Sequence, residues 1–463
     1  MSTSPTANTP AGSTPGIAPG STPGTASRYV VEQRCRSCGH GSLDLVLDLG
    51  RVPLANNLLR TADEPHPRFP LSLAFCPACS LVQIRETVEP EVLFGHYLYF
   101  SSFSQAMLAH AKGEAEMLIR RRNLTRDSLV VEVASNDGYL LKNFVAAGIG
   151  VLGIEPARNI AEVASRNGIP TRCEFFGRDV GQRLAREGVR ADCVLGNNVL
   201  AHVADLNGFV AGAAAMLKPT GVAVFEFPYL GDMIEHAEFD TIYHEHLCYF
   251  SLTAINALFA RHGLIVSDVE RIAVHGGSLR VFAEPAGASP VVAPAVASLL
   301  AHERQIGMTT GAFYARFAQR VRDLCDALVR DLRTRKAAGQ KLAAYGASAK
   351  GSTLMNFAGI DATLLDFICD LSTAKQGHFA PGNALAIVSP DVLRDPARRP
   401  DALVLLSWNW AREIARQQRA YLDGGGEFIV PIPHLHTISA GNLEALDRSA
   451  APVGPTGPLA ARA

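Results

Sequence analysis

The sequence is short of charge, of aromatic side chains and of long apolar runs. Of its 463 residues, 19% are Asp, Glu, Lys or Arg and 7% are Phe, Trp or Tyr, and the formal net charge is −1. Without an excess of positive charge, the chain lacks the electrostatic pattern of proteins that bind nucleic acid or anionic membranes. No run approaches the roughly 18 to 20 apolar residues of a membrane span. Nine cysteines are few for this length and odd in number, which argues against a disulfide scaffold.

The composition that remains indicates a folded protein with several domains. Hydrophobic residues make up 48% of the chain, which is enough to bury sizeable cores. At roughly 150 residues per domain, the length predicts about three domains. Residues 1–27 and 449–463 are rich in Gly, Pro, Ser, Thr and Ala, so we expect disordered tails there and no secretory signal. We expect a cytoplasmic protein that works as a monomer and binds neither nucleic acid nor membranes.

Between these tails the sequence falls into three segments that differ in composition and hydrophobic pattern. Residues 28–90 are turn-rich and hold four of the nine cysteines. Beyond them, short apolar runs alternate with helix-length stretches in two groups, which is typical of βαβ units around parallel sheets. The first group has runs at 129–134, 151–156, 191–197 and 221–227, and the second, after a helical connection at 298–336, has runs at 341–347, 364–370, 402–407 and 427–433. We predict a small module at 28–90, a larger α/β unit at 91–285 and a smaller one at 286–448.

Two CxxC motifs lie in the small module. Cys35 and Cys38 form the first, Cys76 and Cys79 form the second, and 37 residues separate the two pairs. Zinc takes four thiolates in a tetrahedron, and each CxxC turn supplies two of them. Gly39 follows the first pair and allows a tight backbone turn. The alternative is two unrelated pairs of redox or buried cysteines. We predict a closed, structural zinc site, with the other five cysteines as core residues.

A strand, turn and helix around residue 135 predict a cofactor site. Glu132 lies within the strand, and the next run ends in Glu155, where a carboxylate can accept hydrogen bonds from both hydroxyls of a ribose. The pyrophosphate of a dinucleotide needs the pattern GxGxxG, but Ala134 stands at the first glycine position and no third glycine follows Gly138. S-adenosylmethionine fits better, because its zwitterionic methionine end needs no phosphate cradle. The alternative is a turn that binds no ligand.

The densest group of titratable side chains is Tyr243-His244-Glu245-His246. It follows the fourth apolar run of the larger unit, on the side where α/β sheets bind ligands. Histidine suits proton transfer near neutral pH, glutamate can orient it, and tyrosine can donate to an oxyanion. An exposed loop and half of a metal site are the alternatives. His202 is a separate candidate, for which a core or capping role is the default.

A second glycine loop opens a helix in the last unit. It runs from Gly346 to Gly351, and Lys350 precedes its second glycine, whereas the lysine of an ATPase loop follows that glycine. Backbone amides at such a helix start can still hold a diphosphate. Asp370 ends the next apolar run, in a position to contact a ribose. Two nucleotide-sized sites suggest a cofactor on one unit and a nucleotide-bearing substrate on the other.

As a set, these motifs resemble the nucleotide-sugar C-methyltransferases that make branched deoxysugars for antibiotics. The similarity covers residues 28–433 and follows the order of the paired CxxC, SNDG, GIEP, NNVLAH, YHEHLCYFS, HGGSLRV, YGASAKGSTLMN, AKQGHFAPG and FIVPIP motifs. Two positions depart from it: Ala134 stands where a glycine is frequent, and Cys248 stands where a small polar residue is common. The first could alter the cofactor turn, and the second could tune the choice of substrate.

The resemblance implies an α/β protein with a zinc-binding module, a central Rossmann-like class I methyltransferase domain and a C-terminal Rossmann-like domain. Its substrate would be a dTDP-4-keto-6-deoxysugar, methylated at carbon 3 between the last two domains. His246, beside Glu245, would remove the carbon-3 proton, and Tyr243 and His202 would lie near the carbon-4 oxygen of the enolate. The other implied residues are Tyr97 and Tyr99 for the pocket, Glu132, Ala134, Asn136, Gly138, Glu155, Asn197 and Asn198 for the cofactor, and Gly346, Ser348, Lys350, Gly351, Asn356 and Asp370 for the substrate.

Other functions remain open from the residues alone. A methyltransferase that acts on another enolisable carbonyl, or on oxygen or nitrogen, would share the methyl donor and the base. A zinc-ribbon binding protein is disfavoured, because contacts to nucleic-acid phosphates need clustered Lys and Arg. Dehydrogenase chemistry is disfavoured by the missing glycines of the cofactor turn.

Overall fold

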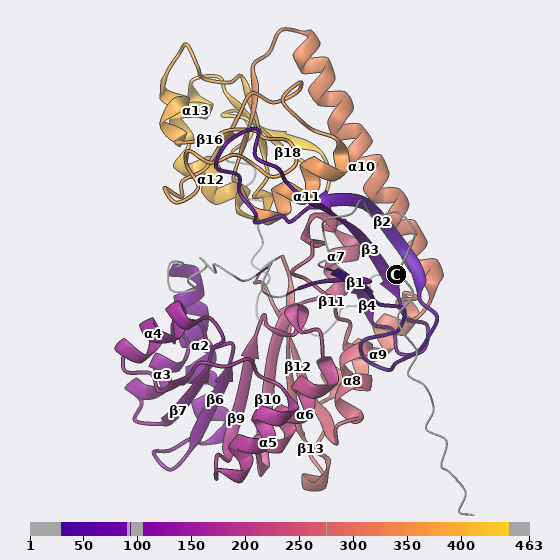
Figure 1. Ribbon diagram of the computed structural model, residues 1–463, viewed down its shortest axis with the longest axis vertical. Coiled ribbons are helices and arrows are strands. Elements are labelled where there is room, and N and C mark those ends of the chain that lie inside the picture. The colour runs from indigo at the N-terminus through magenta and orange to yellow at the C-terminus, as the bar shows by residue number, and fades with distance from the viewer. Residues whose placement is uncertain (1–28, 90–92, 94–104, 275, 444–463) are drawn as a thin grey trace, which may run out of the picture.

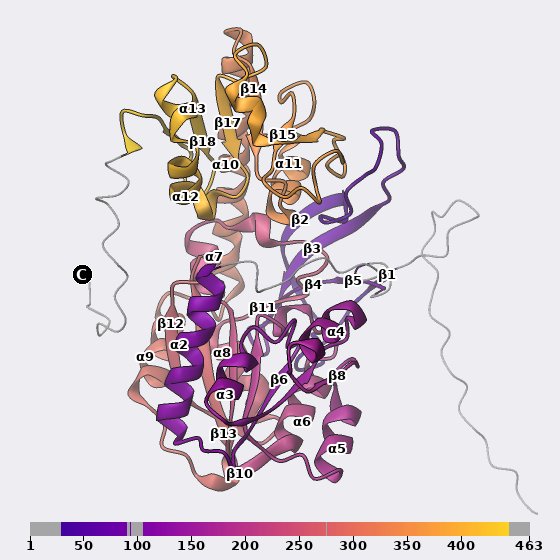
Figure 2. The same ribbon diagram turned by 90° about the vertical axis from the view of Figure 1, so that its left-hand side faces the viewer.

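The computed structural model describes residues 29–89, 93, 105–274 and 276–443. They form a β-sheet module, a larger α/β unit and a smaller α/β unit, and the module lies between the other two in both views (Figures 1 and 2). The predicted architecture of a small N-terminal module and two separate α/β sheets is therefore confirmed. Among the described helices, none is both long and apolar enough to cross a membrane.

The N-terminal module consists of two antiparallel sheets. The main sheet has the order β11-β4-β3-β2, and the second pairs β1 with β5. Its strands are β1 (Tyr29–Val31), β2 (Asp44–Pro53), β3 (Arg68–Phe75), β4 (Val82–Ile84), β5 (Glu86–Val88) and β11 (Cys248–Tyr249). The last of these comes from a distant part of the chain, and Cys248 lies opposite Gln83 of β4. A segment that follows the titratable YHEH cluster thus completes the sheet of the small module.

The central unit is a seven-stranded sheet with the order β12-β13-β10-β9-β6-β7-β8. The five strands from β8 to β10 run parallel, and β13 runs antiparallel between β10 and β12. Its strands are β6 (Leu129–Val133), β7 (Gly150–Ile154), β8 (Thr171–Arg172), β9 (Ala191–Asn197), β10 (Leu217–Pro228), β12 (Leu264–Ile272) and β13 (Ser278–Pro285). The four predicted runs are all strands. The strand order reverses between β6 and β9, which is where open α/β sheets bind ligands.

Helices connect these strands and cover the sheet, as expected for buried parallel strands. They are α2 (Gln105–Arg122), α3 (Leu141–Ala146), α4 (Arg158–Arg166), α5 (Arg178–Arg186), α6 (Leu206–Met216), α7 (Leu230–Glu235) and α8 (Leu252–Ala260), with short 3₁₀ turns η2 (Leu200–His202) and η3 (Phe239–Thr241) near the carboxyl ends of β9 and β10. Both turns lie beside the YHEH cluster, so the sheet edge that carries the candidate site is built from β6, β9 and β10.

The C-terminal unit repeats this plan on a smaller scale, with the strand order β16-β15-β14-β17-β18-β19. All its pairs are parallel except the last, between β18 and β19. Its elements are β14 (Leu342–Tyr345), α11 (Ala349–Ala358), β15 (Ile368–Cys369), β16 (Ile387–Val388), β17 (Ala402–Leu405), η6 (Trp408–Trp410), α12 (Ala411–Gln417), α13 (Arg419–Asp423), β18 (Glu427–Val430) and β19 (His436–Ile438). The strands are shorter than the predicted apolar runs: β14, β17 and β18 end two or three residues before their runs do, and the run at 364–370 enters the sheet only at Ile368.

The predicted helical connection is two helices, α9 (Pro294–Gln305) and α10 (Gly311–Ala337). Gly307, with φ +88°, separates them. Helix α9 packs on β12 and α8 of the central unit, whereas α10 runs along the molecule and packs on β2, α11 and β14 (Figure 1). The long helix therefore contacts both the N-terminal module and the C-terminal unit.

The N-terminal module also contacts the C-terminal unit directly. Leu59 and Phe379 exchange two backbone hydrogen bonds of 2.9 and 2.8 Å, and the Arg68 guanidinium donates to the carbonyl of Gly382 at 2.9 Å. Because the same module takes β11 from the central unit, it joins the two α/β units through backbone as well as side-chain contacts.

Helix α8 begins shortly after β11, and its first backbone amides donate hydrogen bonds to the carboxylate of Glu303 of α9. Glu303 is fully buried and accepts from the Leu252 and Thr253 amides at 2.7 and 2.8 Å and from the Thr253 hydroxyl at 2.6 Å. We predict that Glu303→Ala lowers the free energy of unfolding by about 3 kcal/mol, because buried donors lose a charged acceptor. Urea unfolding would measure this loss. Glu303→Gln keeps one carbonyl acceptor, so a loss as large as that of Glu303→Ala would contradict the explanation.

Candidate active site

The imidazole of His246 has its orientation and tautomer set by the backbone. Its Nδ1 lies 2.9 Å from the carbonyl oxygen of Thr241, which can only accept, so Nδ1 carries the hydrogen. Nε2 is then the acceptor, and the Tyr243 hydroxyl lies 2.9 Å from it. The two rings lie against each other, with centroids 4.1 Å apart. The loop therefore presents a basic nitrogen and a phenol hydroxyl at one point.

His202 joins this pair from the end of β9. It lies in η2, and its ring centroid is 5.0 Å from that of His246. Its Nδ1 donates to the carbonyl of Glu245 at 2.7 Å, and the Leu247 amide donates to the carbonyl of Ala201 at 2.6 Å. Burial lowers the pKa of His202, so this ring is a neutral hydrogen-bonding group near neutral pH. The structure thus brings His202 and Tyr243 next to His246.

Glu245 and His244 point toward the N-terminal module. Burial raises the pKa of Glu245, opposed by a hydrogen bond of 2.7 Å from the Asn56 amide to its carboxylate. His244 is buried, its Nε2 donates to the carbonyl of Pro70 at 3.0 Å, and burial lowers its pKa to about 4. His244 is therefore a neutral contact with the module.

Asn56 was missed by the sequence reasoning. It lies in an ordinary stretch, LANNLL, and carries no motif. The two predicted pocket residues Tyr97 and Tyr99 lie outside the described residues.

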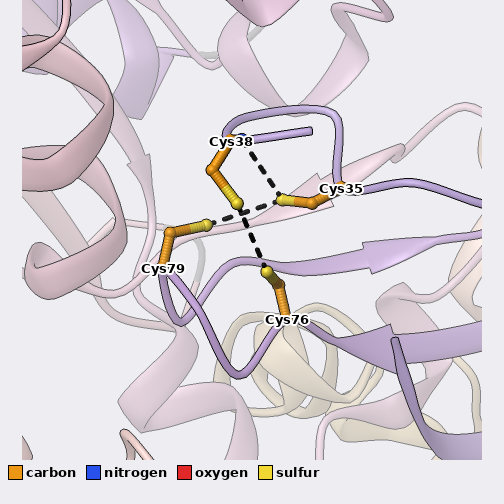
Figure 3. A group of neighbouring side chains, drawn as sticks. All are labelled: Cys35, Cys38, Cys76 and Cys79. Carbon is orange, nitrogen blue, oxygen red and sulfur yellow. Dashed lines mark hydrogen bonds between the residues drawn. The ribbon is translucent and has the colours of Figure 1, made fainter. Parts of the chain in front are cut away.

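The four cysteines of the CxxC motifs converge as zinc ligands do (Figure 3). The Sγ atoms of Cys35 and Cys79 are 3.5 Å apart, and those of Cys38 and Cys76 are 3.6 Å apart. Zinc–sulfur bonds of about 2.3 Å in a tetrahedron place the sulfurs about 3.8 Å apart, so the set fits the ion. Four thiolates this close repel one another unless a dication lies between them. With four protein ligands the coordination shell is closed, and the metal has a structural role.

The second CxxC turn connects this centre to the histidine loop. It is the hairpin between β3 and β4, closed by the Cys76 amide donating to the Leu81 carbonyl at 2.8 Å. The Ile84 amide at the end of β4 then donates to the carbonyl of Leu247 at 3.0 Å. Since Leu247 follows His246 directly, the zinc centre and the candidate base are linked by one short strand.

The turn after β6 has a backbone that favours glycine at three positions. Ala134, Asn136 and Gly138 have φ of +56°, +48° and +80°. A left-handed alanine is strained by about 1 kcal/mol or more, and such strain persists where the surrounding structure holds it. The position where the sequence lacks an expected glycine therefore keeps the conformation that glycine would adopt.

Buried acceptor oxygens line this sheet edge. Among the described residues, Glu132 Oε2, Ser135 Oγ, Asp137 Oδ1 and Asn197 Oδ1 are buried without a hydrogen-bond partner. Burial, with Glu114 and Glu155 nearby, raises the pKa of Glu132 well above its usual value. A set of acceptors around a carboxyl fits a ligand that carries positive charge and hydroxyl groups, as S-adenosylmethionine does. Asn198 has a φ of +55°, and its backbone N–H donates to the carbonyl of Glu226 at 2.8 Å.

Glu155 lies at the end of β7, as predicted for a residue that contacts ribose. Its two carboxylate oxygens accept from the Asn136 and Ala157 amides at 3.0 and 2.9 Å. Burial raises the pKa of Glu155, and these two bonds oppose that shift. Each oxygen has a second lone pair, so the carboxylate can also accept from hydroxyls.

The second glycine loop has the predicted strand–loop–helix form. Ser348 caps α11 by accepting from the Gly351 amide at 3.1 Å, and Gly346 has φ +95°. Asp370 accepts from the Ala347 amide at 2.7 Å and so closes the loop. A side chain at Gly351 would meet Leu406 at 2.6 Å, so this glycine allows the close packing of helix on strand.

Asn356 of α11 holds a neighbouring loop. Its amide nitrogen donates to the carbonyls of Ser352 and Pro381 at 2.9 and 3.0 Å. The Lys350 ammonium lies 4.7 Å from the ring centre of Trp408. Of the predicted substrate residues, Lys350 therefore faces η6, and Asn356 faces the loop after Phe379.

The fold and this site define a methyltransferase with an appended zinc module. Three family models match: "C-methyltransferase C-terminal domain" over residues 273–433, "Putative zinc binding domain" over 35–94 and "Methyltransferase domain" over 107–268. The chain is 41% identical over 411 residues to C-methyltransferase NovU of Streptomyces niveus, covering 88% of this chain and 97% of that protein. The chain belongs to this family of C-methyltransferases. It is thus an enzyme whose cofactors are S-adenosylmethionine and a structural zinc ion.

More distant similarities cover smaller parts of the chain. A ubiquinone biosynthesis O-methyltransferase of Bartonella bacilliformis is 29% identical over 94 residues, which are 20% of this chain and 38% of that protein. Among solved structures, a TehB-like S-adenosylmethionine-dependent methyltransferase from Corynebacterium glutamicum matches with a TM-score of 0.30 and 14% identity. That match covers 37% of this chain and 87% of the other.

We predict that Cys76→Ser removes the bound zinc and also lowers methyl transfer, because the ligand lies in the hairpin that positions β11. Structural zinc contributes on the order of 10 kcal/mol to the folding of small zinc modules, so the melting temperature should fall as well. Metal analysis, calorimetry and an activity assay would measure the three effects. The exposed Cys173 offers a control, since Cys173→Ser should change none of them. Full activity in a zinc-free Cys76→Ser protein would contradict the role given to the metal.

Proposed function

We propose that this enzyme methylates carbon 3 of a dTDP-4-keto-6-deoxysugar in the synthesis of a branched deoxysugar. The observation that carries the proposal is the arrangement of His246, Tyr243 and His202: a ring nitrogen that can accept a proton lies beside a phenol hydroxyl that can donate to an oxygen, and the neutral His202 ring packs on the imidazole. Proton removal next to a ketone needs a base and an oxyanion donor on the same edge of the substrate. A C-methyltransferase needs such a carbon nucleophile, so the site and the family point to the same chemistry.

In this proposal, His246 takes the carbon-3 proton on Nε2. Its Nδ1 hydrogen stays on the Thr241 carbonyl, which stabilises the positive charge that the ring acquires. The Tyr243 hydroxyl turns from Nε2 to the carbon-4 oxygen and donates to it. His202, kept neutral by burial, has its one ring hydrogen on the Glu245 carbonyl and lies beside this oxygen as a neutral ring. Glu245 holds the loop through its carbonyl on one side and through Asn56 on the other.

The residues that would hold S-adenosylmethionine lie at the ends of β6, β7 and β9. Glu132, Asn197 and the turn from Ser135 to Gly138 would surround its methionine end, and Glu155 would accept from its ribose. When bound, this cofactor supplies the methyl group that is transferred. The protein's own contribution is to orient the two reactants and to exclude water between them.

The nucleotide of the substrate would bind the C-terminal unit. The amides at the start of α11 and the ammonium of Lys350 can neutralise a diphosphate, and Asp370 lies at the end of the adjacent strand. The sugar would then extend toward the histidine loop of the central unit. In this proposal the predicted domains at residues 28–90, 91–285 and 286–448 would hold the metal, the cofactor and the nucleotide, respectively.

The proposal is tested with a panel of nucleotide-linked 4-ketosugars, incubated with the enzyme and S-adenosylmethionine. Mass spectrometry should find a product heavier by one methylene group, and NMR should place the new methyl on carbon 3. Methylation only of other enolisable compounds, or of oxygen or nitrogen acceptors, would replace the proposed substrate by one of those classes.

We predict that His246→Asn abolishes both methyl transfer and solvent-deuterium exchange at carbon 3. Asparagine can donate to the Thr241 carbonyl as the imidazole does, but it has no basic nitrogen, so the loop is kept and the base is lost. The affinity for S-adenosylmethionine, measured by calorimetry, should stay unchanged and serves as the internal control. Persistent deuterium exchange in the variant would assign the base to another residue.

We also predict that Asn56→Asp lowers kcat by about tenfold or more, since a second carboxylate would face Glu245 across a hydrogen-bond distance. Repulsion would move the Glu245 carboxylate and, with it, the loop that carries His246. The neighbouring Asn57 is exposed, so Asn57→Asp adds the same charge nearby as a matched control. Equal effects of the two variants on kcat would show that charge alone, and not the contact to Glu245, is responsible.

A further inference from the structure

A buried carboxylate lies where the central and C-terminal units meet. Asp240 belongs to η3 of the central unit and is completely buried. The indole Nε1 of Trp408, from η6 of the C-terminal unit, donates to its Oδ2 at 2.6 Å. Among the described residues, Trp408 is the side chain that donates to the Asp240 carboxylate. The other carboxylate oxygen, Oδ1, has no hydrogen-bond partner among them.

On the side of the central unit, Asp240 is directly connected to the histidine loop. The next residue is Thr241, whose carbonyl accepts from His246 Nδ1 at 2.9 Å and from the Tyr249 hydroxyl at 3.3 Å. This carbonyl is the group that fixes the tautomer and orientation of the imidazole. A movement of Asp240 would therefore move the acceptor that holds His246.

On the other side, Trp408 belongs to the edge of the C-terminal sheet that carries the second glycine loop. Its turn follows β17, and the Lys350 ammonium from the first turn of α11 lies 4.7 Å from the centre of its ring. Phe239 of η3 and Phe357 of α11 also pack on each other between the two units, with ring centroids 5.4 Å apart. The indole thus touches both the carboxylate of the catalytic side and the lysine of the proposed diphosphate loop.

We propose that Asp240 and Trp408 form a positioning pair that aligns the imidazole of His246 with the substrate-binding loop of the C-terminal unit. The inference rests on the proposed function, because it assumes that the nucleotide is held by one unit and the sugar is deprotonated on the other. Those two events require a fixed distance between Lys350 and His246. The hydrogen bond across the interface links the segments that carry them.

Apolar packing alone would hold the two units together without this pair. A buried carboxylate is unfavourable unless it is hydrogen-bonded, so an interface that needed only adhesion would use side chains such as Phe239 and Phe357. A hydrogen bond differs from such packing in being directional: it fixes the rotation of η3 as well as its distance. The imidazole of His246 keeps its tautomer and direction only if the Thr241 carbonyl keeps its orientation.

Three variants separate positioning from adhesion. Trp408→Phe removes the N–H donor and keeps an aromatic ring for Lys350, whereas Asp240→Asn keeps an acceptor for the indole. Trp410→Phe is the matched control, because Trp410 lies in the same turn and is 42% exposed. In Trp408→Phe we expect kcat to fall by about tenfold or more while KM for the nucleotide sugar changes by less than about threefold. Asp240→Asn should retain most of kcat, and Trp410→Phe all of it.

The orientation of the imidazole is read independently of activity, from the ¹⁵N NMR spectrum of the full-length, zinc-loaded protein with labelled histidine. The His246 ring should show one tautomer, protonated at Nδ1, in the unchanged protein and in Trp410→Phe, and a mixture of tautomers in Trp408→Phe. An unchanged spectrum and kcat in Trp408→Phe would overturn the proposal, as would parallel losses of kcat and melting temperature with the spectrum intact. If the unchanged enzyme methylates no 4-ketosugar, the proposed function fails, and the spectrum still decides whether the pair orients His246.

Discussion

The pairing of β11 with β4 fixes the position of the histidine loop, and the rest of the site depends on it. Strand β11 begins two residues after His246, and β4 begins three residues after Cys79. The loop is also held by Pro70 and Asn56 of the N-terminal module and by Ala201 of the central unit. A loop on a sheet edge is normally mobile. Here it lies between the N-terminal module and the central unit, and hydrogen bonds to both hold it in place.

This arrangement explains why the small module needs a metal. A module of about 60 residues buries too little apolar surface to be stable without further support. Its sheet must nevertheless be rigid, because a shift of β4 would shift His246 through β11. A tetrahedron of thiolates fixes the hairpin between β3 and β4 at its end. If His246 is the base, as proposed, a zinc ion held by these cysteines would influence catalysis through the position of the backbone and not through contact with the reacting atoms.

Patterns of neighbouring residues in the sequence predicted the secondary structure and the motifs that neighbouring residues form. The alternation of apolar runs and helical stretches predicted both parallel sheets, and the spacing of the cysteines predicted the metal centre. The contacts between units could not be read in this way. Strand β11 has two residues and no periodicity, Asn56 lies in a stretch without a motif, and the bond from Trp408 to Asp240 joins residues 168 positions apart. Each depends on tertiary packing that a single sequence does not encode locally.

The buried polar groups at the central sheet edge can be compared with the buried Asp240 at the interface between the central and C-terminal units. Glu132 and Asp137 have buried oxygens without partners among the described residues, and Ala134 keeps a left-handed backbone. A fold selected only for stability would have replaced these features, since each is unfavourable by on the order of 1 kcal/mol or more. Their cost is offset when a cationic cofactor supplies the missing partner. Asp240 differs in that its partner, Trp408, belongs to the chain itself. In the proposed function the cofactor edge is completed by a ligand, whereas at the interface the chain itself supplies the donor to Asp240 Oδ2, so the imidazole would be oriented before any substrate arrives.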